Sequence, residues 1–441
     1  MRHALILPDP ARRHLFLVAG PRGWTLPSVS LARDHPGAVD AVIRAVRRRY
    51  GIAVSVLRTF ARPRDPRTGV YNAALELERL DARPPRARGG RWVACEVLGG
   101  IRLHRRDDRE ALARWRASPL GKAEWMRPGW RARAVRWAER RTGSRAMRIV
   151  QLRAWEASTV LRLATRKGTY YLKAVEPPCD HEPGLTRWLA RRFPRAIAPV
   201  VAVDRRGRWL LMRAAHGPSL RYRSRLSDWT RAAREYGWLQ RATLGSPALP
   251  RVLRRRRRDL AWLAAQIDPL VRDTRSLAAG GRWRLTPAQR ARLRRLAPLL
   301  RARVRALARY RIPLALDHGD LWGANVVVGA RGPVILDWED AVLAHPFWAV
   351  FMLPWSHGFW ERWGHRGAAA ARLGEAYLAG WAGPEGAERY REAFRLSRAV
   401  APVHHAAIWW QDVLPYLDSS LETAALLPFF LRRVLEANRR N

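Results

Sequence analysis

The chain has 441 residues, which is too long for one ordinary hydrophobic core, and typical domain sizes predict two domains. Hydrophobic residues make up 48% of the sequence and include 22 tryptophans, so a largely disordered chain is excluded. The formal net charge of +46 would suit a nucleic-acid or anionic-surface partner, but the cationic residues are spread along the whole chain, which argues against a specific nucleic-acid partner.

Lysine is rare among these cations. Of 83 lysines and arginines, only Lys122, Lys167 and Lys173 are lysines. A compact ammonium on a flexible stem does chemistry that a planar guanidinium does not. Each lysine is therefore a candidate for a role that arginine does not fill.

The cysteines and the apolar segments indicate the compartment. Cys95 and Cys179 lie far apart and match no metal-ligand spacing, which predicts a reducing compartment and no disulfide framework. The N-terminal apolar run is too short for a signal peptide, and the most apolar later stretch, residues 341–355, is shorter than a membrane span and is interrupted by His345 and Pro346. We expect a soluble, cytoplasmic protein without a membrane partner, and the sequence leaves its oligomeric state open.

Residues 1–118 predict a small α/β domain. Strand-like runs lie at residues 4–9, 14–20, 71–80 and 91–98. One helix is predicted in the segment 37–51, because apolar residues recur there at helical spacing and Gly51 stands where a helix stop belongs. These apolar residues are Val39, Val42, Ile43 and Val46.

Residues 119–144 form a connector with one amphipathic helix that ends at Thr142 and Gly143. Two strands, 158–165 and 169–175, follow and are joined by a short connection with Gly168 in the turn, which is typical of a β-hairpin. Lys173 is therefore expected near the end of the second strand.

The rest of the chain becomes mainly helical. A helix around 182–193 and strands at 198–204 and 208–214 precede Gly217, and the run of arginines at 254–258 predicts a solvated helix face. A later helix is marked by a capping box of Thr286 and Gln289 around Pro287. Its apolar stripe consists of Leu293, Leu296, Leu300, Val304 and Leu307.

The segment LDHGDLWGANVVVGARGPVILDWED, residues 316–340, is the most informative part of the sequence. Asp320 and Asn325 precede a hairpin through residues 329–333 that should bring Asp337 back beside them. Two carboxylates and an amide are oxygen ligands suited to Mg²⁺, and phosphoryl transfer needs such groups together with a lysine on the phosphates. The alternative is a capped turn whose Asp and Asn bond only backbone amides.

This segment resembles the catalytic region of the aminoglycoside phosphotransferase-like, or choline-kinase-like, branch of the protein-kinase-like fold, and the resemblance covers residues 145–441. It implies an α+β, bilobal domain with an N-lobe at 145–215 and a helical C-lobe at 216–441. By this resemblance Asp320 is the catalytic base, Asn325 and Asp337 are the ligands of Mg²⁺, and Lys173 contacts the phosphates of ATP. His318 is expected to hold the loop rather than carry a proton.

The resemblance leaves several positions open. Glu182 is the best match to the glutamate that pairs with the lysine, with Glu176 as its competitor, and Met212 lies where the family's hinge meets adenine. The family's glycine-rich phosphate loop has no counterpart here, so Ser158 and Thr159 would have to supply the phosphate contacts. Glu339 and Asp340 are either further acidic neighbours of the metal or the polar start of a helix.

The N-terminal region resembles the signature segment of the Nudix hydrolase family. Arg44 and Gly51 fit that signature, but Ala45, Arg48 and Arg49 stand where the metal-binding glutamates belong. We therefore expect residues 1–118 to be Nudix-like in fold and to lack hydrolase activity, because the two arginines would repel Mg²⁺.

The resemblance predicts an ATP- and Mg²⁺-dependent kinase that phosphorylates a hydroxyl of a small molecule. The first alternative is a nucleotide-binding pseudokinase that acts as a regulatory module. The second is a polyanion-binding protein, which requires arginines clustered on one face. The acceptor cannot be read from the sequence, although the C-terminal hundred residues hold few carboxylates for a polycationic aminoglycoside and many tryptophans.

Overall fold

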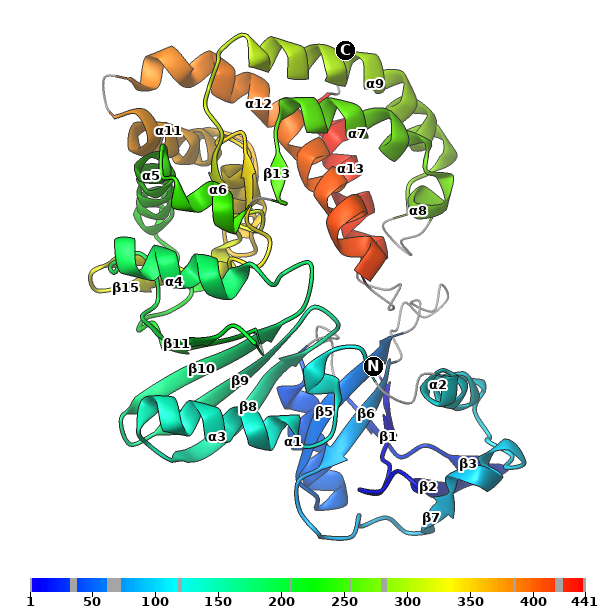
Figure 1. The fold of residues 1–441 in the computed structure, drawn as a ribbon. Helices are drawn as coiled ribbons and strands as arrows, with labels where there is room; N and C mark the ends of the chain where they lie inside the picture. Colours follow the sequence, from blue (N-terminus) through cyan, green and yellow to red (C-terminus); the bar gives the residue numbers. More distant parts are fainter. Residues whose placement is uncertain are drawn as a thin grey trace. The chain divides into compact units, whose positions relative to one another are not determined.

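The computed structural model describes residues 2–31, 38–61, 73–117, 121–206, 208–253, 255–278, 284–383, 386–416 and 423–438. The chain divides into two compact units (Figure 1). Unit 1 comprises Met1–Pro177, Arg206–Leu211 and Tyr416–Glu422, and unit 2 comprises Pro178–Arg205, Met212–Pro415 and Thr423–Asn441. The strands of residues 145–175 are thus grouped with the N-terminal region, so the units do not follow the predicted domain boundaries at 118, 144 and 215, which stay a prediction.

The N-terminal part of unit 1 contains two small sheets, with strand orders β4-β1-β6-β5 and β3-β2-β7. Strands β1 and β6 run parallel, while the other pairs recorded in these sheets are antiparallel. The elements are β1 (Arg2–Ile6), β2 (His14–Gly20), β3 (Gly23–Thr25), β4 (Ser28–Ser30), α1 (Asp40–Tyr50), β5 (Val54–Ala61), β6 (Ala73–Arg79), β7 (Gly90–Ala94) and α2 (Arg106–Ala117).

The helix predicted in this region is confirmed as α1. Val42 and Val46 are buried in the core beneath it, and Gly51 ends the helix with a φ of 72°, a left-handed conformation that glycine adopts without strain. Ala45 is buried, whereas Arg48 and Arg49 are exposed. The positions that carry metal-binding glutamates in the Nudix signature therefore present no carboxylate in this protein.

This region differs from the prediction in several features, because helix α2 and the short strands β3 and β4 were not predicted. The strand predicted over 91–98 ends at Ala94, where a 3-10 helix (Cys95–Gly99) takes over. Strand β5 was not predicted. Its residues are buried on both faces for most of its length, so the sequence lacks the alternation of apolar and polar residues that marks a half-buried strand.

A five-stranded sheet contains the predicted hairpin. Helix α3 (Trp130–Thr142) ends at Gly143 as predicted and packs Trp130 and Trp137 against Trp209. The strands are β8 (Ala146–Ala154), β9 (Ser158–Thr165), β10 (Gly168–Val175), β11 (Val200–Asp204) and β12 (Trp209–Arg213), in the order β11-β12-β10-β9-β8. Lys173 lies near the end of β10, paired with Val160, and only 4% of it is exposed.

Unit 2 is mainly helical. Its helices are α4 (Glu182–Arg192), α5 (Leu226–Thr243), α6 (Ala248–Val252), α7 (Leu260–Arg272), α8 (Thr274–Ala278), α9 (Pro287–Ala308), α10 (Trp360–Trp363), α11 (Ala368–Ala382), α12 (Ala387–Ile408) and α13 (Thr423–Ala437). Its short strands after β12 are β13 (Arg257–Arg258), β14 (Ala315–Asp317), β15 (Val326–Gly329), β16 (Gly332–Ile335) and β17 (Val342–Ala344). The short helices η3 (Leu220–Tyr222), η5 (Gly323–Asn325), η6 (Ala349–Trp355), η7 (Trp409–Val413) and η8 (Leu414–Tyr416) connect them.

Helix α9 confirms the capping box, because Thr286 and Gln289 exchange side-chain and backbone hydrogen bonds of 2.9 and 3.1 Å. Residues 255–258 of the arginine run do not form a helix, so the prediction of a helix face was wrong for them. Arg257 and Arg258 form β13, which pairs with β17, and Arg256 is 7% exposed. Among the described residues, no helix is both long enough and apolar enough to cross a membrane.

Candidate functional site

The loop that starts at His318 is held at both ends by short strands of unit 2. Strand β14 leads into the loop, and β17 pairs with it in antiparallel register, with Asp317 opposite Val342. Gly319 has a φ of 76°, and a Cβ atom there would lie 2.2 Å from the carbonyl oxygen of Asp340. Only glycine allows the segments before β17 and after β14 to approach this closely.

Asp317 stabilises the start of the loop through a hydrogen bond to its backbone. Its side chain is fully buried, and Oδ1 accepts a hydrogen bond of 2.7 Å from the backbone N–H of Gly319. Burial raises the pKa of Asp317 to about 7, although the backbone hydrogen bonds from Gly319 and Ala349 oppose this shift. The sequence does not indicate this role, because an aspartate before the motif does not reveal its burial.

His318 fixes the shape of the loop. Its ring is fully buried against Trp338, with 4.6 Å between the ring centroids. Nε2 lies 2.9 Å from the carbonyl oxygen of Leu336, and Nδ1 accepts a hydrogen bond of 3.3 Å from the N–H of Asp320. Both ring nitrogens are therefore engaged with the backbone, as expected for a histidine that holds the loop.

Asp320 and Asn325 lie in direct contact. The side-chain amide of Asn325 donates to the backbone oxygen of Asp320 at 2.9 Å and to its carboxylate Oδ2 at 3.0 Å. The β15–β16 hairpin then returns the chain, and the N–H of Leu336 donates to the backbone oxygen of Asn325 at 2.8 Å. Asp337 follows Leu336 directly, so the predicted convergence of Asp320, Asn325 and Asp337 occurs within unit 2.

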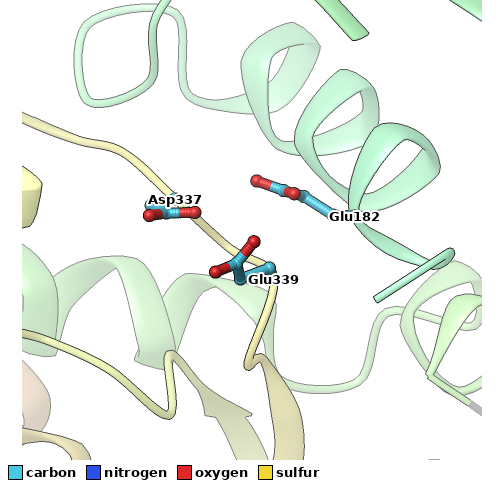
Figure 2. A group of neighbouring side chains, drawn as sticks. All are labelled: Glu182, Asp337 and Glu339. Atoms are coloured by element: carbon cyan, nitrogen blue, oxygen red, sulfur yellow. The ribbon is translucent and has the colours of Figure 1, made fainter. Parts of the chain in front are cut away.

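Three carboxylates meet at Asp337 (Figure 2). Each of Glu182, Asp337 and Glu339 offers an oxygen atom, and these atoms lie within 4.8 Å of one another. Figure 2 shows the Glu182 side chain extending from α4 toward the loop that carries the other two residues. Asp337 has a φ of 65°, an uncommon conformation for a residue other than glycine that often marks functional sites.

Negative charge is concentrated around this cluster. The pKa of Asp340 is raised well above its ordinary value, first by burial and then by the carboxylates of Asp320, Glu339 and Asp337. A divalent cation would offset this repulsion, and clustered carboxylates with a nearby amide are the ligands that Mg²⁺ prefers. The residues present therefore fit a magnesium ion chemically, and Glu339 belongs to the acidic group rather than to a helix start.

Arg256 connects the two segments that carry these carboxylates. Its side chain donates to the carbonyl oxygen of Ala341 at 2.8 Å and to that of Pro178 at 3.2 Å. Pro178 lies shortly before α4, and Ala341 directly follows Asp340. Arg256 is also the cation that opposes the raised pKa of Asp340. The sequence does not indicate this role, because Arg256 lies within a run of arginines and nothing local distinguishes it from them.

The remaining predicted residues lie in the five-stranded sheet or next to it. Glu176, the competitor of Glu182, forms an ion pair with Arg208. Ser158 and Thr159 are fully buried, the Ser158 hydroxyl accepts from Trp155 Nε1 at 2.8 Å, and the Thr159 hydroxyl donates to the oxygen of Arg153 at 2.8 Å. Both hydroxyl groups are therefore engaged in hydrogen bonds within the protein.

Lys173 and Met212 complete the predicted set. Lys173 belongs to unit 1, and Met212 is half-buried near the end of β12. The described contacts bring together Glu182, Asp320, Asn325 and Asp337. Nucleotide contacts by Lys173, Ser158 and Met212 stay predictions.

Comparison with solved structures places the fold. An ethanolamine kinase of Plasmodium vivax superposes with a TM-score of 0.50 and 9% identity, over 77% of this chain and 96% of that one. A choline kinase of Cryptosporidium parvum Iowa II gives 0.49 and 9%, over 71% and 92%. A thermostable mutant of an aminoglycoside phosphotransferase, in complex with ADP and hygromycin B, gives 0.45 and 13%, over 70% and 99%.

Of these three, only the ethanolamine kinase reaches a TM-score that supports a shared fold, and it supports the predicted α+β, kinase-like class. A comparison with curated protein sequences found no match. The Nudix-like fold of the N-terminal region stays a prediction. The model of the phosphotransferase enzyme family matches residues 148–392, more than half of the chain, and the protein therefore belongs to that family.

Proposed function

We propose that the protein is an ATP- and Mg²⁺-dependent small-molecule kinase that transfers the γ-phosphoryl group to a hydroxyl of its substrate. The observation that supports this most is the contact of Asp320 and Asn325 beside the carboxylates of Glu182, Asp337 and Glu339. Phosphoryl transfer relies on positioning and electrostatic stabilisation, and this group of residues supplies both.

Asp320 is the proposed base. Its carboxylate would accept the proton of the attacking hydroxyl, and the hydrogen bond from Asn325 to Oδ2 orients it for that task. The second oxygen, Oδ1, would then face the acceptor. His318 positions Asp320 through the bond from its backbone N–H to Nδ1.

Asn325 and Asp337 are the proposed ligands of Mg²⁺, with Glu182 and Glu339 as acidic neighbours. When bound, the ion would neutralise charge on the phosphates. Lys173 would contact the phosphates of the nucleotide, and its near-complete burial agrees with a role that needs a single lysine geometry.

The test is Asp320→Ala, with Asp268→Ala on α7 as a matched control. Asp268 is a partly exposed aspartate that pairs with Arg301 within the described part of the chain. Consumption of ATP is measured with sugars, amino alcohols, nucleosides and aminoglycosides as acceptors. We expect Asp320→Ala to lower turnover by about 10² or more while the thermal midpoint changes little, and Asp268→Ala to keep full turnover.

Two results would contradict the proposal. Turnover of Asp320→Ala near the wild-type rate would remove Asp320 as the base. Tight binding of Mg²⁺–ATP to the wild-type protein, without consumption of ATP with any acceptor class, would favour the pseudokinase alternative.

A further inference from the structure

A cavity lies in the helical part of unit 2, and residues of η6, α11, α12 and α13 line it. Its volume is about 490 Å³, within the range of roughly 300–1,000 Å³ typical of small-molecule sites. Its lining includes the apolar residues Val350, Leu373 and Phe394. None of the residues proposed for phosphoryl transfer lines it.

The lining is also rich in cations. Its basic residues are Arg366, Arg395, Arg398, Arg433 and His365. Glu436 is the one acidic residue among those that line the cavity. The lining therefore holds an excess of positive charge, although arginine is common throughout the sequence. Arg366, Arg395 and Arg398 are exposed, so it is the fixed positions of His365 and Arg433 that separate this site from the general surface charge.

Trp355 holds two of these groups in place. The His365 ring stacks on it with 3.6 Å between the centroids and 23° between the planes. The guanidinium carbon of Arg433 lies 3.9 Å from the Trp355 centroid, a cation–π distance. Both groups are thus preorganised at the cavity wall rather than left as flexible surface side chains.

Arg433 retains unused hydrogen-bonding capacity. Its side chain is 12% exposed, and NH1 donates to Glu436 Oε2 at 2.6 Å. Its Nε atom is buried and has no hydrogen-bond partner among the described residues. Because the Nε atom is enclosed, Arg433 would offer a ligand in the cavity its positive charge and not a hydrogen bond from Nε.

The basic groups repel one another. The pKa of Arg398 is lowered, first by partial burial, which removes water from its charged form, and then by the positive charge of Arg366. The pKa of His365 is lowered by burial and then by the positive charge of Arg366. Arg433 and Arg398 lower it further, while Glu436 alone raises it. Glu436, which pairs with Arg433, therefore does not balance the positive charge of the other basic groups that line the cavity.

We propose that this cavity binds a small organic anion, with its phosphate or carboxylate group at Arg366, Arg398 and Arg433 and its apolar part against Val350, Leu373 and Phe394. Guanidinium groups favour phosphate and carboxylate because their paired donors match two oxygens. The apolar part of the lining favours an organic anion over a free inorganic one, since burial of apolar surface adds to the affinity. This inference does not depend on the proposed kinase activity.

The experiment titrates phenyl phosphate, inorganic phosphate and benzyl alcohol into the full chain at about 0.15 M salt, where attraction by distant exposed charges is largely screened. Binding is followed by calorimetry and by the His365 ring resonance in NMR, which is identified by its loss in His365→Gln. We expect one saturable site for phenyl phosphate, at least about 10-fold weaker binding of the other two probes, and a raised His365 pKa in the complex.

Arg366→Gln and Arg398→Gln should each weaken phenyl phosphate binding by about 10-fold or more, because each removes a charged donor. Arg372→Gln is the control, since Arg372 is an exposed arginine of α11 that does not line the cavity. Equal weakening by the control, unchanged binding in both test variants, or an unshifted His365 resonance would overturn the proposal. Tighter binding of inorganic phosphate than of phenyl phosphate would overturn the organic part of it.

Discussion

Three histidines of unit 2 are buried together without the solvent that would stabilise their charged forms. His345, His404 and His405 are each at most 1% exposed. The His404 ring lies 4.1 Å from that of Trp348, and neither of its nitrogens has a hydrogen-bond partner among the described residues. Burial lowers the pKa of His345 to about 3 and of His405 to about 4.

His404 has the same environment. Its pKa is lowered well below the ordinary value by burial, and then by His405, Arg258 and His345. In the unfolded chain each histidine titrates near 6.5. A histidine with a lowered pKa in the folded state leaves stability intact above about pH 6.5, and stability is lost as the pH falls toward its folded-state value, because the unfolded chain binds the extra proton.

The magnitude follows from this linkage. Each pH unit below 6.5 costs about 1.4 kcal/mol per histidine that stays neutral in the folded protein. Between pH 6.5 and pH 5, His404 alone should therefore remove ~2 kcal/mol from the free energy of unfolding. Three such histidines together would remove ~6 kcal/mol, comparable with the whole net stability of a typical domain.

The perturbation is His404→Leu. Leucine fills a similar volume, and its introduction removes two buried nitrogens that lack partners, so at pH 7.5 the free energy of unfolding should change by no more than about 1 kcal/mol. Between pH 7.5 and pH 5, the free energy of unfolding should fall by ~2 kcal/mol less in the variant than in the wild type. The exposed His216→Leu serves as the matched control and should leave the pH profile unchanged.

The assay is urea unfolding followed by tryptophan fluorescence at pH values from 7.5 to 5. The difference between variant and wild type cancels the contribution of groups elsewhere in the chain. Parallel pH profiles for His404→Leu and the wild type would refute the reasoning. A loss of several kcal/mol at pH 7.5 would show instead that the imidazole contributes packing or a bond that leucine cannot replace.

Three further predictions concern the site and the charge. Lys173→Arg should lower turnover by about 10-fold or more in the ATP-consumption assay, since a guanidinium keeps the charge but not the shape, and full activity would make the lysine incidental. The full chain carrying Asp320→Ala should release no phosphate or pyrophosphate from nucleoside diphosphate compounds with Mg²⁺, and any such release would contradict an inactive N-terminal region. Oligonucleotide binding should be weak at about 0.15 M salt and strengthen steeply at lower salt. Arg234 lines a groove with five other arginines and the half-exposed Trp238. Tight, selective binding that is lost in Arg234→Gln would favour the polyanion-binding alternative.

The sequence determined those features that depend on neighbours within a few residues. Gly51 and the capping box at Thr286 mark helix ends through local backbone chemistry, and both lie where they were predicted. The spacing of Asp320, Asn325 and Asp337 works in the same way, because a short hairpin fixes the distance between them. These local constraints also carried the family resemblance that the match over residues 148–392 confirmed.

Tertiary structure alone decided which distant residues meet. Glu182 joins Asp337 and Glu339 across more than 150 residues, and Arg256 reaches both segments although its sequence neighbours suggested a solvated surface. Burial made the same residue types different: His404 is enclosed, while other histidines are exposed. Periodicity and composition describe which face of an element is apolar, but long-range packing determines which charges are brought together and how much water remains between them.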